Sequence, residues 1–134
     1  MEKLPNELGN IIRNYIIFKP KTKEELQNAV NLWCENKNEA LMKYGHISLW
    51  DTSFITDMSY LFLDKKYFNE NINSWDVSNV TNMESMFLSV KSLFNQPLNS
   101  WDVSSVTNMS HMFCGTKYFN QPLNSWDVSS VINM

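Results

Sequence analysis

Apolar residues in the first third of the chain recur at helical spacing. Over residues 4–17 they form one apolar stripe, which predicts a short helix with Pro5 in its first turn. A second helix is expected to begin after Thr22, because Glu25 three residues later completes a capping box. The polar stretch 36–38 can interrupt this second helix, and Gly45 is expected to end it.

From residue 50 onward, one short pattern of apolar and polar positions is repeated. The string Trp-Asp-Val-Ser-x-Val-Thr-Asn-Met begins at Trp75 and Trp101, recurs at Trp126 with Ile132 in place of the Thr, and has a looser copy at Trp50. The steps between these tryptophans are 25, 26 and 25 residues. A period in this range is typical of stacked supersecondary units.

Each repeat divides into three parts by the spacing of its apolar residues. In residues 98–122, Trp101 and Val103 alternate as in a short strand, and Ser104 or Ser105 can cap a short helix. The buried face of that helix would carry Val106, Met109, Met112 and Phe113. The chain then turns and returns through Phe119 to the next strand.

These units predict an α/β solenoid of 25–26-residue strand–short helix–loop repeats, similar to leucine-rich repeats, with a helical cap. Residues 1–48 would form the N-terminal cap, and residues 49–134 three repeats plus a partial fourth. Stacking would place Trp75 on Trp101 and Phe87 on Phe113. Burying one such aromatic side chain contributes about 2–3 kcal/mol, so the repeats are expected to be stable only as neighbours.

Composition and charge narrow the classes of partner. Residues 49–134 carry four Lys and eight Asp or Glu, a net charge of −4, which argues against nucleic acid as a partner.

The longest apolar run, residues 15–18, is too short to span a membrane. The start of the chain does not look like a signal peptide, which favours a cytoplasmic or virion-associated protein. Cys34 and Cys114 are expected to be buried free thiols.

The repeated aspartates would form a column with two interpretations: Asp51, Asp76, Asp102 and Asp127. They could bind a row of cations, or each could accept hydrogen bonds from the backbone of the following turn. The second interpretation is expected, because no other ligands converge on the column. No grouping of residues predicts a catalytic site, a metal site or a cofactor, so a non-enzymatic protein is expected.

The repeated string, with Met-x-x-Met-Phe and then Phe-Asn-x-Pro-Leu-Asn-x-Trp, is similar to the BspA-type repeat of bacterial surface proteins. That repeat is abundant in mycoplasma surface lipoproteins and also occurs in other bacteria, protists, algae and large DNA viruses. The resemblance covers residues 50–134, and residues 22–42 together with residues 45–50 look like the family's leader. It implies a leucine-rich-repeat-like solenoid and a role in adhesion or protein–protein contact. A lipoprotein signal is not seen, and the last copy stops at Met134 before its Met-Phe.

Residues 4–17 also resemble the opening of an F-box, through Leu-Pro-Asn-Glu-Leu and the apolar residues after it. That resemblance implies an adaptor that recruits a ubiquitin-ligase core. The same residues also fit a plain amphipathic capping helix.

Three functions follow as hypotheses. The first is a repeat scaffold that binds an unidentified protein through side chains that vary between copies: Tyr60, Ser85 and His111, or Asn79 and Ser105. The second is a structural, self-assembling component of a virion or surface layer, which associates through the edge at Trp126 and Val128. The third is the F-box-like adaptor.

Overall fold

The computed structural model describes residues 16–134, and its regular elements all lie near the beginning of that range. They are helix α2 (Lys23–Glu35), helix α3 (Lys37–Tyr44) and a 3-10 turn, η1 (Ile47–Leu49). The helix expected over residues 4–17 falls outside the described residues, apart from Ile16 and Ile17. Among the described residues, no helix has the length and apolar character needed to cross a membrane.

Capping residues determine where the two helices begin and end. The Thr22 side chain accepts a hydrogen bond from the Glu25 amide at 3.1 Å, which confirms the predicted start of α2. Asn36 both ends α2 and caps α3, because its side-chain oxygen accepts from the Glu39 amide at 3.2 Å. Gly45 ends α3 with φ of 76°, a left-handed conformation that suits glycine.

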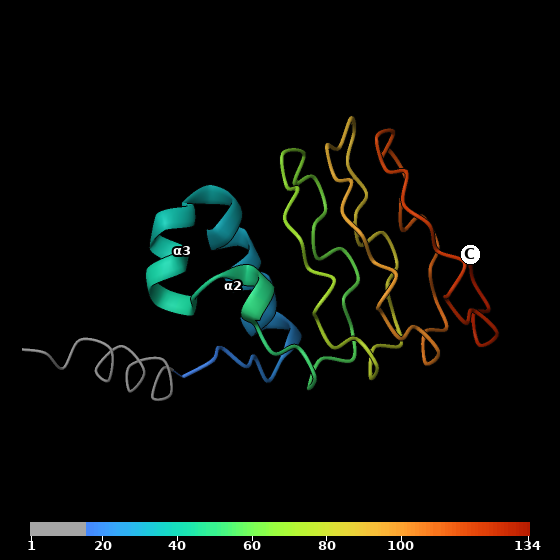
Figure 1. Cartoon of the computed structure of the whole chain (residues 1–134), viewed down its shortest axis with the longest axis horizontal. Helices are drawn as coiled ribbons and strands as arrows, with labels where there is room; N and C mark the ends of the chain where they lie inside the picture. Colours follow the sequence, from blue (N-terminus) through green and yellow to red (C-terminus); the bar gives the residue numbers. More distant parts are fainter. Residues whose placement is uncertain (1–15) are drawn as a thin grey trace, which may run out of the picture.

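The prediction of strand–short helix–loop repeats is wrong. From residue 50 to 134 the described chain contains no helix and no strand, so it is not an α/β solenoid. The strand-like pairing in this region is limited to three isolated parallel bridges between successive repeats. They join Asp57 to Asn82, Asn82 to Asn108, and Asn108 to Asn133. Each repeat is instead one coil of irregular backbone built from tight turns, and the coils lie side by side (Figure 1).

The tight turns explain why the spacing of apolar residues in each repeat predicted a helix. The Met86 amide donates to the Met83 carbonyl at 3.2 Å and the Leu88 amide to the Ser85 carbonyl at 3.2 Å, so the chain turns every three residues. Consecutive turns of this kind bury every third side chain, as the face of a helix does. The amides of Met83, Ser85 and Phe87 donate instead to the next coil, a pairing that a helix would not allow.

The expected strand is absent for a similar reason. The Trp101 amide closes a turn onto the Leu98 carbonyl at 3.1 Å, and the Asp102 carboxylate accepts from the Ser104 amide at 3.0 Å. The backbone groups around Trp101 and Val103 therefore have local partners and form no ladder. Both side chains are nevertheless buried, as their alternation predicted.

Columns of aromatic rings hold the coils together. The Phe62, Phe87 and Phe113 rings stack at centroid distances of 5.4 and 5.7 Å, which confirms the predicted contact of Phe87 with Phe113. A second column of Phe68, Phe94 and Phe119 has spacings of 5.8 and 5.9 Å. Beside them lie the repeated tryptophans, whose indole N–H groups bond backbone carbonyls earlier in the chain: Trp75 to Ile47, Trp101 to Ile72 and Trp126 to Leu98.

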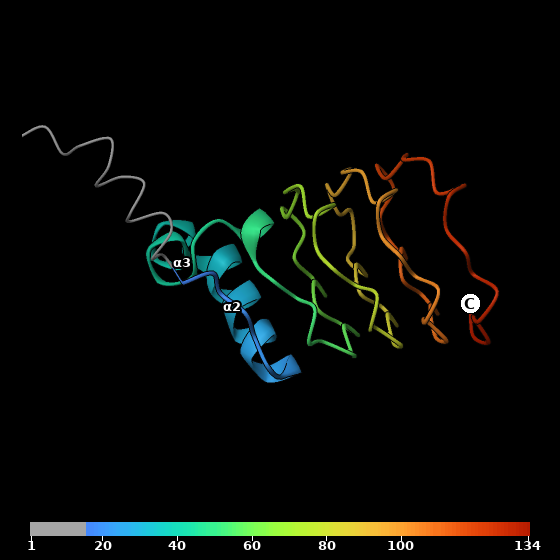
Figure 2. The same cartoon turned by 60° about the horizontal axis from the view of Figure 1, so that its bottom comes forward.

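Helices α2 and α3 lie at one end of the stack of coils, and the C-terminus lies at the other (Figures 1 and 2). The Trp33 ring of α2 meets the Trp50 ring edge-on at 6.0 Å. The Gln27 side chain donates to the Leu61 carbonyl at 2.9 Å, and Lys23 reaches Asp57 at 3.3 Å. The helices thus contact the first coil through both apolar and polar groups.

Candidate functional site

One candidate row follows a single backbone position through three coils. Tyr60, Ser85 and His111 all have a left-handed backbone, with φ of 62°, 52° and 58°. The Tyr60 amide donates to the Glu84 carbonyl and the Ser85 amide to the Ser110 carbonyl, both at 2.9 Å, so these bonds hold the row in register. The same backbone position therefore presents a different side chain in each coil.

The three side chains of this row differ in their exposure to solvent. Tyr60 and His111 are exposed. Ser85 is only 4% exposed and therefore cannot contact a partner directly. The prediction that Ser85 is a contact residue is therefore wrong. A hydrogen bond to the Glu84 carboxylate raises the pKa of the Tyr60 phenol, and Lys23 lies 5.9 Å from the Tyr60 ring centroid. Tyr60 thus has both an acidic and a basic neighbour.

The alternative row, Asn79 and Ser105, is exposed at both positions. The Asn79 amide group donates to the Ser53 carbonyl of the preceding coil at 2.8 Å. Its side chain is therefore partly committed to the stack, whereas Ser105 carries a hydroxyl on the surface.

The repeated aspartates serve the backbone, as expected from their place before a turn. Each carboxylate accepts from the amide two residues later at 3.0 Å, in the pairs Asp51 with Ser53, Asp76 with Ser78, Asp102 with Ser104, and Asp127 with Ser129. Hydrogen bonds from the serines lower the pKa of Asp51, Asp102 and Asp127. Among residues 16–134, no group of three His, Cys, Asp or Glu side chains is placed to hold a metal ion.

A second row of side-chain caps was missed in the sequence. The side chains of Asp57, Asn82 and Asn108 accept from the amides two residues later at 2.8–2.9 Å. These residues also form the bridges between coils. The signal was present, because an Asn or Asp precedes the Met at this place in every copy.

A ladder of asparagines also joins the returning parts of successive coils. The Asn95 side chain accepts from the Asn120 amide at 2.9 Å, and the Asn69 side chain accepts likewise from the Asn95 amide. The ladder thus satisfies backbone amides on the returning parts of the coils.

The last coil carries the edge predicted from Trp126 and Val128. Both residues line an apolar hollow of about 460 Å³, together with side chains of the preceding coil that include Met109, Met112 and Phe113. In earlier coils the corresponding phenylalanine, Phe87, is covered by the next coil and is 2% exposed. Phe113, by contrast, is only half-buried.

The two cysteines are free and exposed, so the expectation of buried thiols is wrong. Cys34 lies at the edge of a hollow between α2 and the first coil, with Lys65 and Glu70 nearby. Partial burial in this hollow raises the pKa of the Cys34 thiol to about 11.

The comparisons with known proteins place the chain in a family without naming an activity. The family described as "Mycoplasma protein of unknown function, DUF285" matches residues 27–134. No curated protein and no solved structure matches the chain. The matched range takes in both helices from Gln27 onward and all the coils, and the family is related to the BspA-like mycoplasma repeat proteins that the sequence resembles. The chain therefore belongs to this mycoplasma family of unknown function.

Proposed function

We propose that this protein is a non-enzymatic repeat scaffold that binds another protein through the exposed side chains of its coils. The observation that carries the proposal is the row in which Tyr60 and His111 present unlike, exposed side chains from one repeated backbone geometry. A surface of this kind can change its specificity by substitution without disturbing the stack. The BspA-type resemblance, with its roles in adhesion and protein contact, supports the same function.

The unfavourable left-handed backbone at these positions also supports the proposal. A left-handed conformation costs a residue other than glycine about 1–2 kcal/mol. Glycine would remove that cost, yet tyrosine, serine and histidine occupy the three positions. A side chain retained at a strained and exposed position is consistent with a contact role for Tyr60 and His111.

The test uses a double variant, Tyr60→Ala/His111→Ala, and a matched control, Met42→Ala. Met42 is an exposed side chain on α3, 88% accessible, and it lies outside the coils. The purified chain, fixed to a support, captures proteins from a lysate of the source cells, and the captured proteins are identified and titrated individually. We expect a specific partner to lose affinity at least tenfold for the double variant and to bind the control normally. Equal capture by all three proteins would reject this surface.

A second function, structural self-assembly, is favoured by the open face at Trp126 and Val128. A second copy could cover the apolar hollow there, as each coil covers the one before it. Light scattering across concentrations, on the parent chain and on Trp126→Lys, tests this alternative. Because Trp126 also bonds the Leu98 carbonyl, the milder variant Val128→Lys keeps that bond and serves as a second test. A parent chain that stays monomeric at high concentration would remove this alternative.

A further inference from the structure

The basic residues of the coils are confined to one edge of the stack. Residues 49–134 contain four basic side chains, and all four lie in the turns between the two phenylalanines of each coil: Lys65, Lys66, Lys91 and Lys117. The same turns expose large apolar side chains, with Tyr67 at 76%, Val90 at 74% and Tyr118 at 51%. We name this edge the return-turn ridge, which comprises Lys66, Tyr67, Val90, Lys91, Lys117 and Tyr118.

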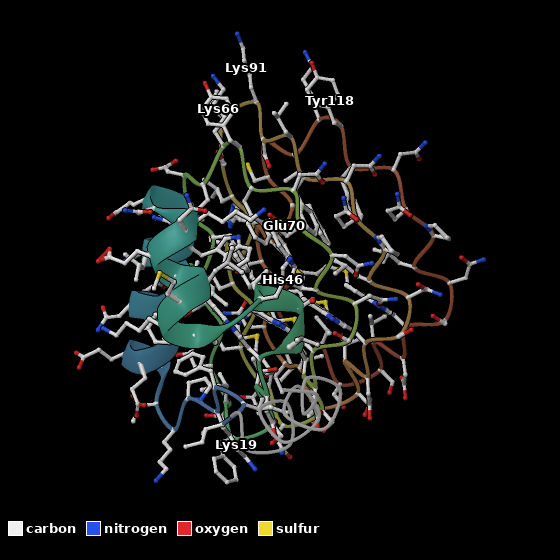
Figure 3. The ribbon with its side chains drawn as sticks, turned by 60° about the vertical axis from the view of Figure 1, so that its left-hand side comes forward. Lys19, His46, Lys66, Glu70, Lys91 and Tyr118 are labelled. Atoms are coloured by element: carbon white, nitrogen blue, oxygen red, sulfur yellow. The ribbon has the colours of Figure 1, made fainter. Side chains whose placement is uncertain are left out.

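Hydrogen bonds between coils hold the three turns side by side. The Leu93 amide donates to the Lys66 carbonyl at 2.9 Å, and the Ser89 amide donates to the Cys114 carbonyl at 3.1 Å. Lys66, Lys91 and Tyr118 accordingly project from neighbouring turns at the same edge of the molecule (Figure 3). The ridge is thus one continuous surface rather than three separate loops.

Three repeated aspartates lie at the opposite edge, although Asp64 and Glu70 flank the first return turn. The turns that carry Asp76, Asp102 and Asp127 run along the bottom of Figure 1, and the return turns run along the top. All three aspartates are exposed. An anionic surface would therefore attract the return-turn ridge and repel the aspartate edge, so the charges of the coils give the molecule a preferred orientation.

We propose that the return-turn ridge binds the surface of a membrane that contains anionic lipids. The lysines would meet the headgroups, while the tyrosine rings and Val90 enter the boundary between headgroups and acyl chains. Lysine and tyrosine are both suited to this boundary, because each combines an apolar body with a polar end. The contact is made at the surface and is separate from the protein-binding row at Tyr60 and His111.

The shape of the ridge favours a lipid surface over an acidic protein. Its apolar side chains are exposed on three separate turns, so a protein partner would need a fitted recess for each of them. A headgroup layer yields to all of them at once. Val90, an exposed aliphatic side chain, gains nothing from a carboxylate but gains from partial burial among acyl chains.

Co-sedimentation with vesicles tests the proposal with the full chain. We expect binding to vesicles of phosphatidylcholine and phosphatidylserine in equal parts, and much weaker binding to phosphatidylcholine alone. Each lysine near an anionic surface is worth roughly fivefold in affinity, so Lys91→Glu/Lys117→Glu should weaken binding at least about 25-fold. The control, Lys21→Glu/Lys43→Glu, makes the same change in net charge at exposed residues outside the coils and should keep most of the binding.

A third variant separates insertion from charge attraction. Val90→Ser keeps every lysine and should weaken binding about three- to tenfold, because it removes one exposed apolar side chain. Thermal melting of each variant checks that the coils remain folded. Equal losses for the two lysine pairs, or unchanged binding of Val90→Ser, would overturn the proposal. So would tight binding to soluble polyglutamate without binding to the vesicles, which would instead identify an acidic protein as the partner.

Discussion

The helices and the coils of this protein satisfy their backbone groups in opposite ways. In α2 and α3 each amide finds its partner within the same turn of chain, and Thr22 and Asn36 complete the ends. In the coils many amides bond carbonyls about one repeat away, as the Phe87 amide does with the Met112 carbonyl at 2.9 Å. A coil is therefore incomplete without its neighbour, whereas a helix is nearly complete alone.

This difference explains how the two regions fit together. The helices meet the first coil with the Trp33 ring and the Gln27 side chain, and their own backbone is already satisfied. At the other end, the last coil has open apolar surface around Trp126. We infer that stability in the coils comes mainly from contacts between neighbours, and in the helices from local bonds and one packed face.

The largest effect is expected at the centre of the stack. Phe87→Ala should destabilise the fold by about 3–5 kcal/mol, because Phe87 is 2% exposed and stacks on both Phe62 and Phe113. Urea unfolding followed by tryptophan fluorescence measures the change. The matched control is Phe113→Ala, at a half-buried position in the same column, which should cost clearly less. Equal costs would contradict the dependence on two neighbours.

A smaller but still large effect is expected at Gly115. A Cβ atom there would lie 2.1 Å from the Ser89 carbonyl oxygen of the preceding coil, so Gly115→Ala must push two coils apart. The left-handed backbone, with φ of 84°, adds strain, and we expect a loss of about 2 kcal/mol or more in the same unfolding experiment.

The equivalent residue of the first coil provides the control for Gly115. Asp64 is also left-handed, with φ of 59°, yet it holds a side chain. Asp64→Gly should therefore change stability little, or raise it by up to about 1 kcal/mol. Strong destabilisation by Asp64→Gly would contradict the expected relief of backbone strain in this turn.

The helical region should respond more weakly to a comparable change. Thr22→Ala removes the side-chain acceptor for the Glu25 amide and should cost about 1 kcal/mol. Thr22→Ser keeps the acceptor and should behave like the parent chain. A loss of several kcal/mol would mean that α2 controls the stability of the coils, against the contrast drawn above.

The sequence predicted the local part of this structure far better than the part that depends on neighbours. The start of α2, the break near Asn36 and the stop at Gly45 all follow from side chains that act within four residues, and all were expected. The strand and the short helix of each repeat were wrong. A spacing of three residues between buried methionines fits a helix and a series of tight turns equally well.

The candidate surfaces show the same limit. The turn-capping role of the aspartates was predictable because the partner lies two residues away. The burial of Ser85 was not, because it depends on how neighbouring coils close over that position. The return-turn ridge was also missed, although its signal was in the sequence: all the lysines of the repeats fall in one phase. Counting net charge over the whole region hid this arrangement.

The smallest predicted effect concerns acid, and it compares two bonds made by one aspartate. In the folded chain the Ser104 hydroxyl, and then the Ser104 amide, lower the pKa of Asp102 by hydrogen bonds. Folding therefore favours the ionised carboxylate. Its contribution is present above the ordinary pKa of an aspartate and is lost as the pH falls through the lowered pKa. The thermal midpoint should accordingly fall between pH 5 and pH 3, at roughly the range where aspartates titrate.

Two substitutions at this turn separate the charge from the bond. Asp102→Asn keeps an oxygen for the Ser104 amide but cannot ionise, so the fall in midpoint with acid should be smaller than in the parent chain. Ser104→Ala removes the hydroxyl and leaves the amide, so its profile should lie between the two. An unchanged profile in Asp102→Asn would mean that the other carboxylates of the coils carry the acid response. The bond within the turn would then act only on local geometry, as the caps of the helices do.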